Sequence, residues 1–312
     1  MRWWWIRVVV LSLEACGGRD TVYLYGQPKS GTTWVEVIVD TLVAETCGDN
    51  CSDAVVTQGK SRSAAIDEGT EKVEFCCKHY LPGGKKVGKQ DFSSLLVFAD
   101  SSLEAVLAPC VKNKWPVWSP RCVPPNALDV SALGPHRYVL IVRDPRAVAV
   151  SAYHFFREKG PIGKYCREAV WKIAALESLR YYWFEKVRET NPTLILFYED
   201  LLEDTYAQYY RVATFLRLHP PIDVMRAVVA KTSAAAMKIQ EKQKKLPGPN
   251  RKGAESKVRS ANAEGFRDEI SRADKTALAA VTRAMRPYLH PALAFRYLNT
   301  YAQDIAFFQG GH

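Results

Sequence analysis

The chain has 312 residues, of which 47% are hydrophobic and 24% are charged. This length suffices for one large domain that buries roughly 75% of its unfolded surface, and the composition excludes a disordered tail protein, a collagen and a coiled coil. The formal net charge of +10 favours an anionic partner.

The cysteines and the apolar N-terminal run bear on localisation. The eight cysteines include no two C-x2-C units and no histidine spaced to complete a zinc site, so we expect reduced thiols and a cytoplasmic protein. Residues 3–13 are apolar except for Arg7 and Ser12, and this run falls short of the about 18 residues that span a bilayer, so we expect no stable membrane insertion. A signal peptide is the alternative, because Arg2 precedes the run and small residues follow it.

The predicted elements alternate between strands and helices. Order and periodicity predict an α/β fold, a single domain over residues 1–312 whose central parallel sheet is flanked by helices. Residues 83–133 are treated as an insertion, and residues 238–259 form a predicted basic loop with eight basic and two acidic residues. Strands are predicted at 22–26, 73–77, 137–142 and 193–198, and helices at 34–44, from near 146, and at 164–189, 206–216, 222–231 and 272–285.

The first predicted strand leads through a short loop into a helix. Such a loop presents backbone N–H groups and a helix N-terminus, which favour a phosphate group. It is P-loop-like, but a Walker A loop would need lysine where Thr32 stands, and Lys29 lies three residues earlier. A lysine on the ligand side of this turn can stabilise negative charge that develops during group transfer.

These residues carry a family resemblance. The run Lys29-Ser30-Gly31-Thr32-Thr33, with Pro28 before it and Trp34 after it, resembles the 5′-phosphosulfate loop of the cytosolic sulfotransferases. The resemblance makes residues 20–45 the phosphosulfate loop unit. It implies 3′-phosphoadenosine 5′-phosphosulfate (PAPS) as sulfuryl donor, 3′-phosphoadenosine 5′-phosphate (PAP) as product, and no metal.

A second segment begins where the predicted strand 137–142 ends. An arginine at a strand end and a serine about two turns into the next helix can grip one phosphate. The run from Arg143 to Ser151 is similar to the family's 3′-phosphate segment, which implies that these two residues bind the 3′-phosphate. The alternative is a local ion pair between Arg143 and Asp144.

Three further segments follow in the family's order. Tyr198, at a strand end, resembles a residue near the adenine, and Thr232 resembles one that contacts the adenosine. Ala234 stands where the family has a stacking aromatic ring, so another ring, such as Trp34, would have to cover the adenine, or the donor would bind more weakly. Arg251, Lys252 and Gly253 resemble a loop that closes over the 3′-phosphate, with a solvated lysine-rich loop as the alternative.

The catalytic base is the open point. Transfer to a hydroxyl needs a group that takes the acceptor's proton. Lys78 and His79 resemble the family's catalytic strand, but the histidine comes one residue early, and Tyr80 occupies its place. A one-residue shift turns a side chain to the other face unless a bulge intervenes. We prefer His79, with Tyr80, Glu36, His154 or a residue of the insertion as alternatives.

The resulting prediction is a sulfotransferase that moves a sulfuryl group in line from PAPS to a hydroxyl or amine of a small-molecule acceptor, without nucleic acid as a partner. Three alternatives stay open: a P-loop-type nucleotide phosphotransferase, a basic protein that binds polyanions or acidic membranes through residues 238–259, and a nucleotide-binding relic without catalysis. The sequence does not identify the acceptor. It also leaves the oligomeric state open, because the family's K-T-V-E dimer pattern is absent.

Overall fold

The computed structural model describes residues 7–13, 20–26, 29–47, 137–156, 158–243, 246, 261–272 and 274–299. Its centre is a four-stranded sheet in the order β1-β2-β3-β4. The strands are β1 (Arg7–Leu13), β2 (Asp20–Gly26), β3 (Arg137–Val142) and β4 (Thr193–Phe197). Strands β2, β3 and β4 are parallel, as the alternation of strands and helices predicts, whereas β1 pairs antiparallel with β2.

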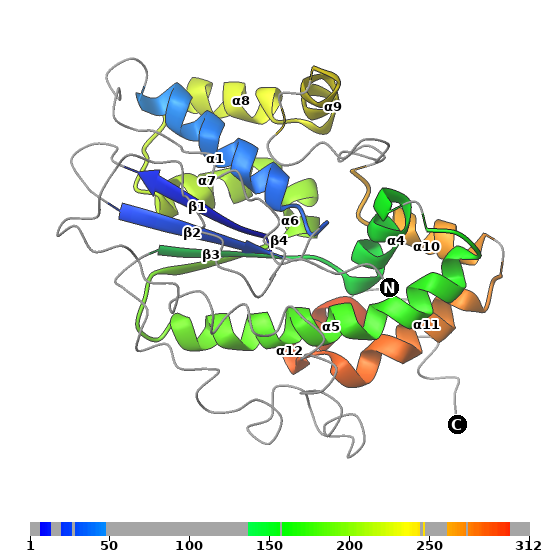
Figure 1. Cartoon of the computed structure of the whole chain (residues 1–312). Coiled ribbons are helices and arrows are strands. Elements are labelled where there is room, and N and C mark those ends of the chain that lie inside the picture. Colours follow the sequence, from blue (N-terminus) through cyan, green and yellow to red (C-terminus); the bar gives the residue numbers. More distant parts are fainter. Residues whose placement is uncertain are drawn as a thin grey trace, which may run out of the picture.

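Helices cover both faces of this sheet (Figure 1). Helix α1 runs along one face with α7, α8 and α9, while α5, α11 and α12 lie on the other (Figure 1). Helices α4 and α10 stand beyond the ends of the strands (Figure 1). The bounds are α1 (Thr32–Cys47), α4 (Pro145–Phe156), α5 (Ile162–Val187), α6 (Tyr198–Glu203), α7 (Thr205–Phe215), α8 (Ile222–Lys231), α9 (Ala234–Lys242), α10 (Gly265–Ser271), α11 (Ala277–Met285) and α12 (Pro291–Ala294), with the 3-10 turn η5 (Arg286–Tyr288) and the π-helical turn η6 (Phe295–Asn299).

Strand β3 is buried along its whole length, as its continuous apolar sequence predicts. Successive side chains of a strand point to opposite faces. Val139 and Ile141 accordingly pack into the core beneath α1, α7 and α8. Tyr138, Leu140 and Val142 pack into the second core, beneath α4, α5 and α11. The two cores hold the carboxyl ends of the parallel strands side by side. Helices α1, α4 and α6 begin just after these ends.

The structure corrects several predicted elements. The predicted N-terminal apolar run contributes strand β1, and the strand predicted to end at Tyr198 ends at Phe197 because Tyr198 begins α6. The helix predicted over 272–285 begins at Ala277, and residues 265–271 form the separate helix α10.

The predicted basic loop is partly wrong, since residues 238–242 belong to helix α9. The Ser233 hydroxyl caps this helix by accepting from the Ala236 N–H, and an alanine run favours its first turn. The predicted strand 73–77, the insertion 83–133 and the remainder of the basic loop apart from residues 243 and 246 lie outside the described residues.

Candidate donor-binding site

The loop between β2 and α1 is shaped by two residues with positive φ. Lys29 has a φ of 76° and Gly31 a φ of 107°. The Gly31 carbonyl then accepts the N–H groups of Trp34 (2.9 Å) and Val35 (3.1 Å), which closes the first helical turn. Since that turn contains no acidic residue, the N-terminus of α1 remains suited to an anion.

Two glycines let this loop lie directly on its neighbours. A Cβ atom at Gly31 would lie 2.7 Å from Cδ2 of Tyr198, and one at Gly26 would lie 2.5 Å from Cγ2 of Thr32 and 2.7 Å from Cγ2 of Ile141. Real Cβ atoms do not approach other atoms so closely, so a larger residue at either position would push the loop away from β3 and Tyr198. The glycines therefore bring the loop to the ends of β3 and β4.

Arg143 joins the loop to the end of β3. Its Nη1 donates to the Lys29 carbonyl over 2.9 Å, and its guanidinium carbon lies 4.0 Å from the ring centroid of Tyr198. The residue is 9% exposed, and its Nε has no hydrogen-bond partner among the described residues. A buried guanidinium with a spare donor beside a helix N-terminus is suited to a phosphate.

The ammonium of Lys29 lies against the next helix. Its Nζ is 4.2 Å from the centroid of the Phe155 ring in α4, a cation–π contact. Ser151 precedes Phe155 by one helical turn and so lies on the same side of α4. Lys29 in the loop thus lies against Arg143 and against the side of α4 that carries Ser151 and Phe155. Phe155 was not predicted as part of the site, because an aromatic residue at helical spacing equally indicates the core.

The aromatic side chains near the loop are tied together by neutral hydrogen bonds. Trp34 packs edge-on against Tyr198 with centroids 5.5 Å apart. Its indole N–H donates to the Tyr209 hydroxyl (3.1 Å) and to the Thr232 carbonyl (3.0 Å). The Thr232 hydroxyl donates to the Val228 carbonyl (2.8 Å) and lies 2.7 Å from the Tyr209 hydroxyl. Burial raises the pKa of Tyr209 to about 12.

The remaining predicted site residues are either outside the described residues or engaged in contacts within the fold. Lys78, His79 and Tyr80, and likewise Arg251, Lys252 and Gly253, lie outside the described residues. Of the alternative bases, Glu36 is 1% exposed within α1. The Nε2 of His154 lies 2.6 Å from Oε2 of Glu269 in α10, which makes this histidine a link between two helices. Ala234, where the family has an aromatic ring, begins α9.

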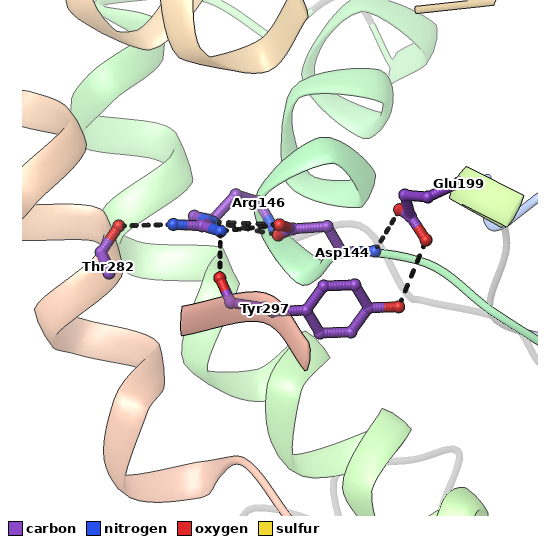
Figure 2. A network of polar contacts seen from close by, with 5 residues as sticks. All are labelled: Asp144, Arg146, Glu199, Thr282 and Tyr297. Carbon is purple, nitrogen blue, oxygen red and sulfur yellow. Dashed lines mark hydrogen bonds and ion pairs between the residues drawn. The ribbon is translucent and has the colours of Figure 1, made fainter. Parts of the chain in front are cut away.

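A buried network lies directly beneath the strand ends (Figure 2). Asp144 pairs with Arg146 (2.8 Å), not with Arg143 as the alternative prediction had it. Arg146 also donates to the Thr282 hydroxyl (3.0 Å) and the Tyr297 carbonyl (2.9 Å). Glu199 accepts from the Asp144 backbone N–H (2.9 Å) and from the Tyr297 hydroxyl (3.4 Å). The network links the β3–α4 connection and helix α4 with α6, α11 and η6.

Burial has a strong effect on the carboxyl groups near this network. It raises the pKa of Glu199, whereas the hydrogen bond from the Asp144 N–H acts in the opposite direction and the Asp144 carboxylate adds a smaller rise. Glu177 in α5 is fully buried, and neither of its carboxyl oxygens has a hydrogen-bond partner among the described residues. Burial raises the pKa of Glu177 to about 8 although Arg180 acts in the opposite direction. Burial thus favours the neutral, protonated form of Glu177.

The described residues offer neither a metal-binding cluster nor a membrane-spanning helix. Among residues 137–156, 158–243 and the other described stretches, no three histidine, cysteine or acidic side chains gather in a way that could hold a metal ion. No described helix has the length and apolar character needed to cross a bilayer.

Comparison with known proteins identifies the family. The sulfotransferase domain model matches residues 19–289. Sulfotransferase 1A1 of Bos taurus is 26% identical over 227 residues, and sulfotransferase 1E1 of Rattus norvegicus is 24% identical over 227 residues; each match covers 70% of this chain and 66% of the relative. This chain thus spans slightly less than two thirds of those relatives.

One solved structure, retinol dehydratase in complex with androsterone and inactive cofactor PAP, is 20% identical, covers 87% of this chain and 82% of its own, and has a TM-score of 0.48. Because the family model spans most of the chain, including the loop before α1 and the ends of β3 and β4, the chain belongs to the sulfotransferase domain family.

Proposed function

We infer that the protein is a PAPS-dependent sulfotransferase that transfers a sulfuryl group to a hydroxyl or amine of a small-molecule acceptor. The observation that carries this function is the position of Arg143. This buried guanidinium bonds the loop carbonyl of Lys29, lies on the ring of Tyr198, and keeps Nε without a hydrogen-bond partner among the described residues. Family membership and the +10 net charge support the same function.

Each part of the donor has a proposed partner. The loop 29–33 and the N-terminus of α1 would hold the 5′-phosphosulfate through backbone N–H groups. Arg143 and Ser151 would bind the 3′-phosphate, assisted by the 251–253 loop. The rings of Trp34 and Tyr198 border the proposed adenosine position. The Thr232 hydroxyl is engaged with Val228, so we expect its main contribution there to be holding Trp34 in place through its carbonyl.

The transfer would proceed by in-line displacement at sulfur. A lone pair on the acceptor oxygen or nitrogen forms the new bond to sulfur, while the bond from sulfur to the bridging oxygen breaks and leaves its electron pair on the 5′-phosphate. Lys29 would stabilise that charge, and orientation by the site would bring the reactants together. The residues named supply positive charge without requiring a metal ion.

The base that takes the acceptor's proton stays a proposal. His79, assisted by Lys78, is the preferred residue, and Tyr80, Glu36 and His154 are the alternatives. The pairing of His154 with Glu269 and the deep burial of Glu36 both count against those two residues. A cytoplasmic location is likewise a proposal. The identity of the acceptor and the oligomeric state are open.

Calorimetric titration with PAP, and with adenosine 5′-phosphate (AMP) for comparison, tests the donor site. We expect PAP to bind far more tightly than AMP. Arg143→Ala should weaken PAP binding about 10- to 100-fold, because a hydrogen bond to a charged group is worth about 1.5–3 kcal/mol, and should leave AMP binding nearly unchanged. Equal, weak and salt-sensitive binding of both nucleotides would instead indicate a general basic surface.

A second variant separates catalysis from binding. Lys29→Ala should lower the rate of sulfuryl transfer from PAPS by at least about a hundredfold while the fold and most of the PAP affinity remain, because the charge that Lys29 stabilises develops in the transition state. The acceptor screen uses labelled PAPS with small phenols, alcohols and amines. Lys164→Ala and Arg167→Ala, both on the exposed side of α5, are the matched controls. Full turnover in Lys29→Ala would refute the role of Lys29.

A further inference from the structure

The two strand ends that carry Arg143 and Tyr198 are joined beyond the sheet itself. The parallel ladder between β3 and β4 ends at the pair Val142–Phe197. Arg143 and Tyr198 are the next residues on each strand, and they contact each other. One residue further on, the Asp144 N–H donates to Oε1 of Glu199 over 2.9 Å. A buried side-chain hydrogen bond therefore continues the pairing of the two strands past their last ladder pair.

The C-terminal turn η6 holds this junction from below (Figure 2). The hydroxyl of Tyr297 donates to Oε2 of Glu199, and the Tyr297 carbonyl accepts from Arg146. The neighbouring Arg296 pairs with Asp200, and its guanidinium carbon lies 3.9 Å from the centroid of the Phe197 ring. Two consecutive residues of η6 thus contact Phe197, Glu199 and Asp200 at the β4–α6 junction, although 96 and 98 positions separate the hydrogen-bonded pairs in sequence.

Asp144, Arg146, Glu199 and Tyr297 are buried and already hydrogen-bonded, so they do not bind a ligand directly. The Asp144 carboxylate accepts from the backbone N–H, Nε and Nη2 of Arg146, and both residues are fully buried. Tyr297 is 1% exposed, and Glu199 is 9% exposed. A closed ring of contacts runs from Asp144 through Glu199, Tyr297 and Arg146 back to Asp144. Any effect of this ring on the donor must therefore act through the residues that it holds in place.

We propose that Tyr297 and Glu199 are positioning residues of the donor site, through which the C-terminal turn η6 sets the placement of Arg143 against Tyr198. This inference rests on the proposed function, since it assigns to Arg143 the recognition of the 3′-phosphate. Loss of the Tyr297 hydroxyl removes the second partner of Glu199 and frees the carboxyl group to rotate away from the Asp144 N–H. The guanidinium of Arg143 then loses its fixed position, and the site loses discrimination for the 3′-phosphate.

The test compares PAP and AMP affinities in the full-length chain. Tyr297→Phe should lower the ratio of PAP to AMP affinity about 3- to 10-fold, as expected for one buried hydrogen bond. Glu199→Ala should lower it further, and Glu199→Gln, which keeps an acceptor for the Asp144 N–H, should restore part of the loss. Tyr210→Phe is the matched control, because Tyr210 lies in α7 and is 58% exposed.

The melting temperature of each variant separates positioning from scaffolding. A lower melting temperature with an unchanged PAP to AMP ratio in both Tyr297→Phe and Glu199→Ala would overturn the inference and leave the ring a structural element only. If Tyr297→Phe does not fold, the pair Glu199→Gln and Glu199→Ala supplies the same comparison. A wild-type chain that binds PAP and AMP equally would overturn the proposed function itself, whereas wild-type discrimination that survives in every variant would overturn this inference alone.

Discussion

Two clusters of buried polar groups, one on each side of the sheet, are built in different ways. Beneath α1, α7 and α8, the buried polar groups of Trp34, Tyr209 and Thr232 form neutral hydrogen bonds, and each keeps more than one partner. On the opposite face, Asp144 and Arg146 form an ion pair with no exposed surface. A neutral group that loses one of two partners loses little, whereas a buried charge that loses its partner is strongly destabilising.

The charged network directly adjoins the proposed donor site. Arg143 and Tyr198 lie at the boundary between the faces, and the residue after each belongs to the charged network. The network of Asp144, Arg146, Glu199 and Tyr297 holds the strand ends, and we expect it to be more sensitive to mutation than the neutral cluster. Substitutions on the two faces should show this contrast in unfolding free energy.

The largest effect is expected for Arg146→Met. It leaves Asp144 buried without its cation, so the free energy of unfolding should fall by about 3–5 kcal/mol. Urea unfolding of wild type, Arg146→Met, Asp144→Asn and the double variant gives the coupling between the two side chains. The double variant should recover part of the loss. A cost below about 1 kcal/mol for Arg146→Met would remove the contrast between the two faces.

An effect that depends on pH is expected for Glu177→Gln. The folded-state pKa of Glu177 is raised from 4.5 to about 8, so its contribution to stability is full below pH 4.5 and is lost as pH rises through 8. The glutamine variant lacks this loss and should be more stable than wild type at pH 8 to 9, by on the order of a few kcal/mol.

Unfolding free energies measured from pH 5 to 9 test this expectation. Glu168→Gln, on the exposed side of α5, controls for the loss of one acidic side chain. If the difference between Glu177→Gln and wild type stays constant over that pH range, Glu177 is not protonated in the folded protein.

The smallest effect is expected for Tyr209→Phe, in the neutral cluster that Tyr209 forms with Trp34 and Thr232. In this variant the Trp34 indole N–H still donates to the Thr232 carbonyl, and the Thr232 hydroxyl still donates to the Val228 carbonyl. The loss should therefore be about 1 kcal/mol. The neighbouring Tyr210 is 58% exposed, so Tyr210→Phe should change the unfolding free energy by less than about 0.5 kcal/mol. A loss at Tyr209 as large as that at Arg146 would show that both faces are equally sensitive.

Much of the fold was predictable because its strands carry strong local patterns. The run from Arg137 to Val142 is continuously apolar after its first residue, and its predicted bounds are those of β3. Helix α8 likewise begins and ends where its periodicity indicates. Strand β1 was missed because a short apolar run looks the same in a leader segment and in an edge strand. Helix α9 was missed because its lysines suggested a loop, although Ser233 and the alanines after it favour a helix.

The location of the candidate site was predictable to the extent that contiguous motifs define it, while the roles of its residues stay predictions. The loop from Lys29 to Trp34 and the residue Arg143 could be found because short spacings fix their place at strand ends. The contacts of Glu199 with Tyr297 could not be found, because they join residues 98 positions apart and leave no periodic signal. The partner of Lys29, Phe155, was hidden for a different reason, since an aromatic residue in an apolar helix is typical of any core.

The backbone of Lys29 places folding stability in opposition to the catalytic role proposed for its ammonium group. With a φ of 76°, this residue adopts a conformation that glycine reaches at no steric cost and that a residue with a Cβ reaches at a cost of about 1 kcal/mol or more. Selection for thermal stability alone would therefore favour glycine here and would discard the ammonium group. A library of the protein sorted first for stability and then for turnover should lose this lysine in the first step and require it in the second.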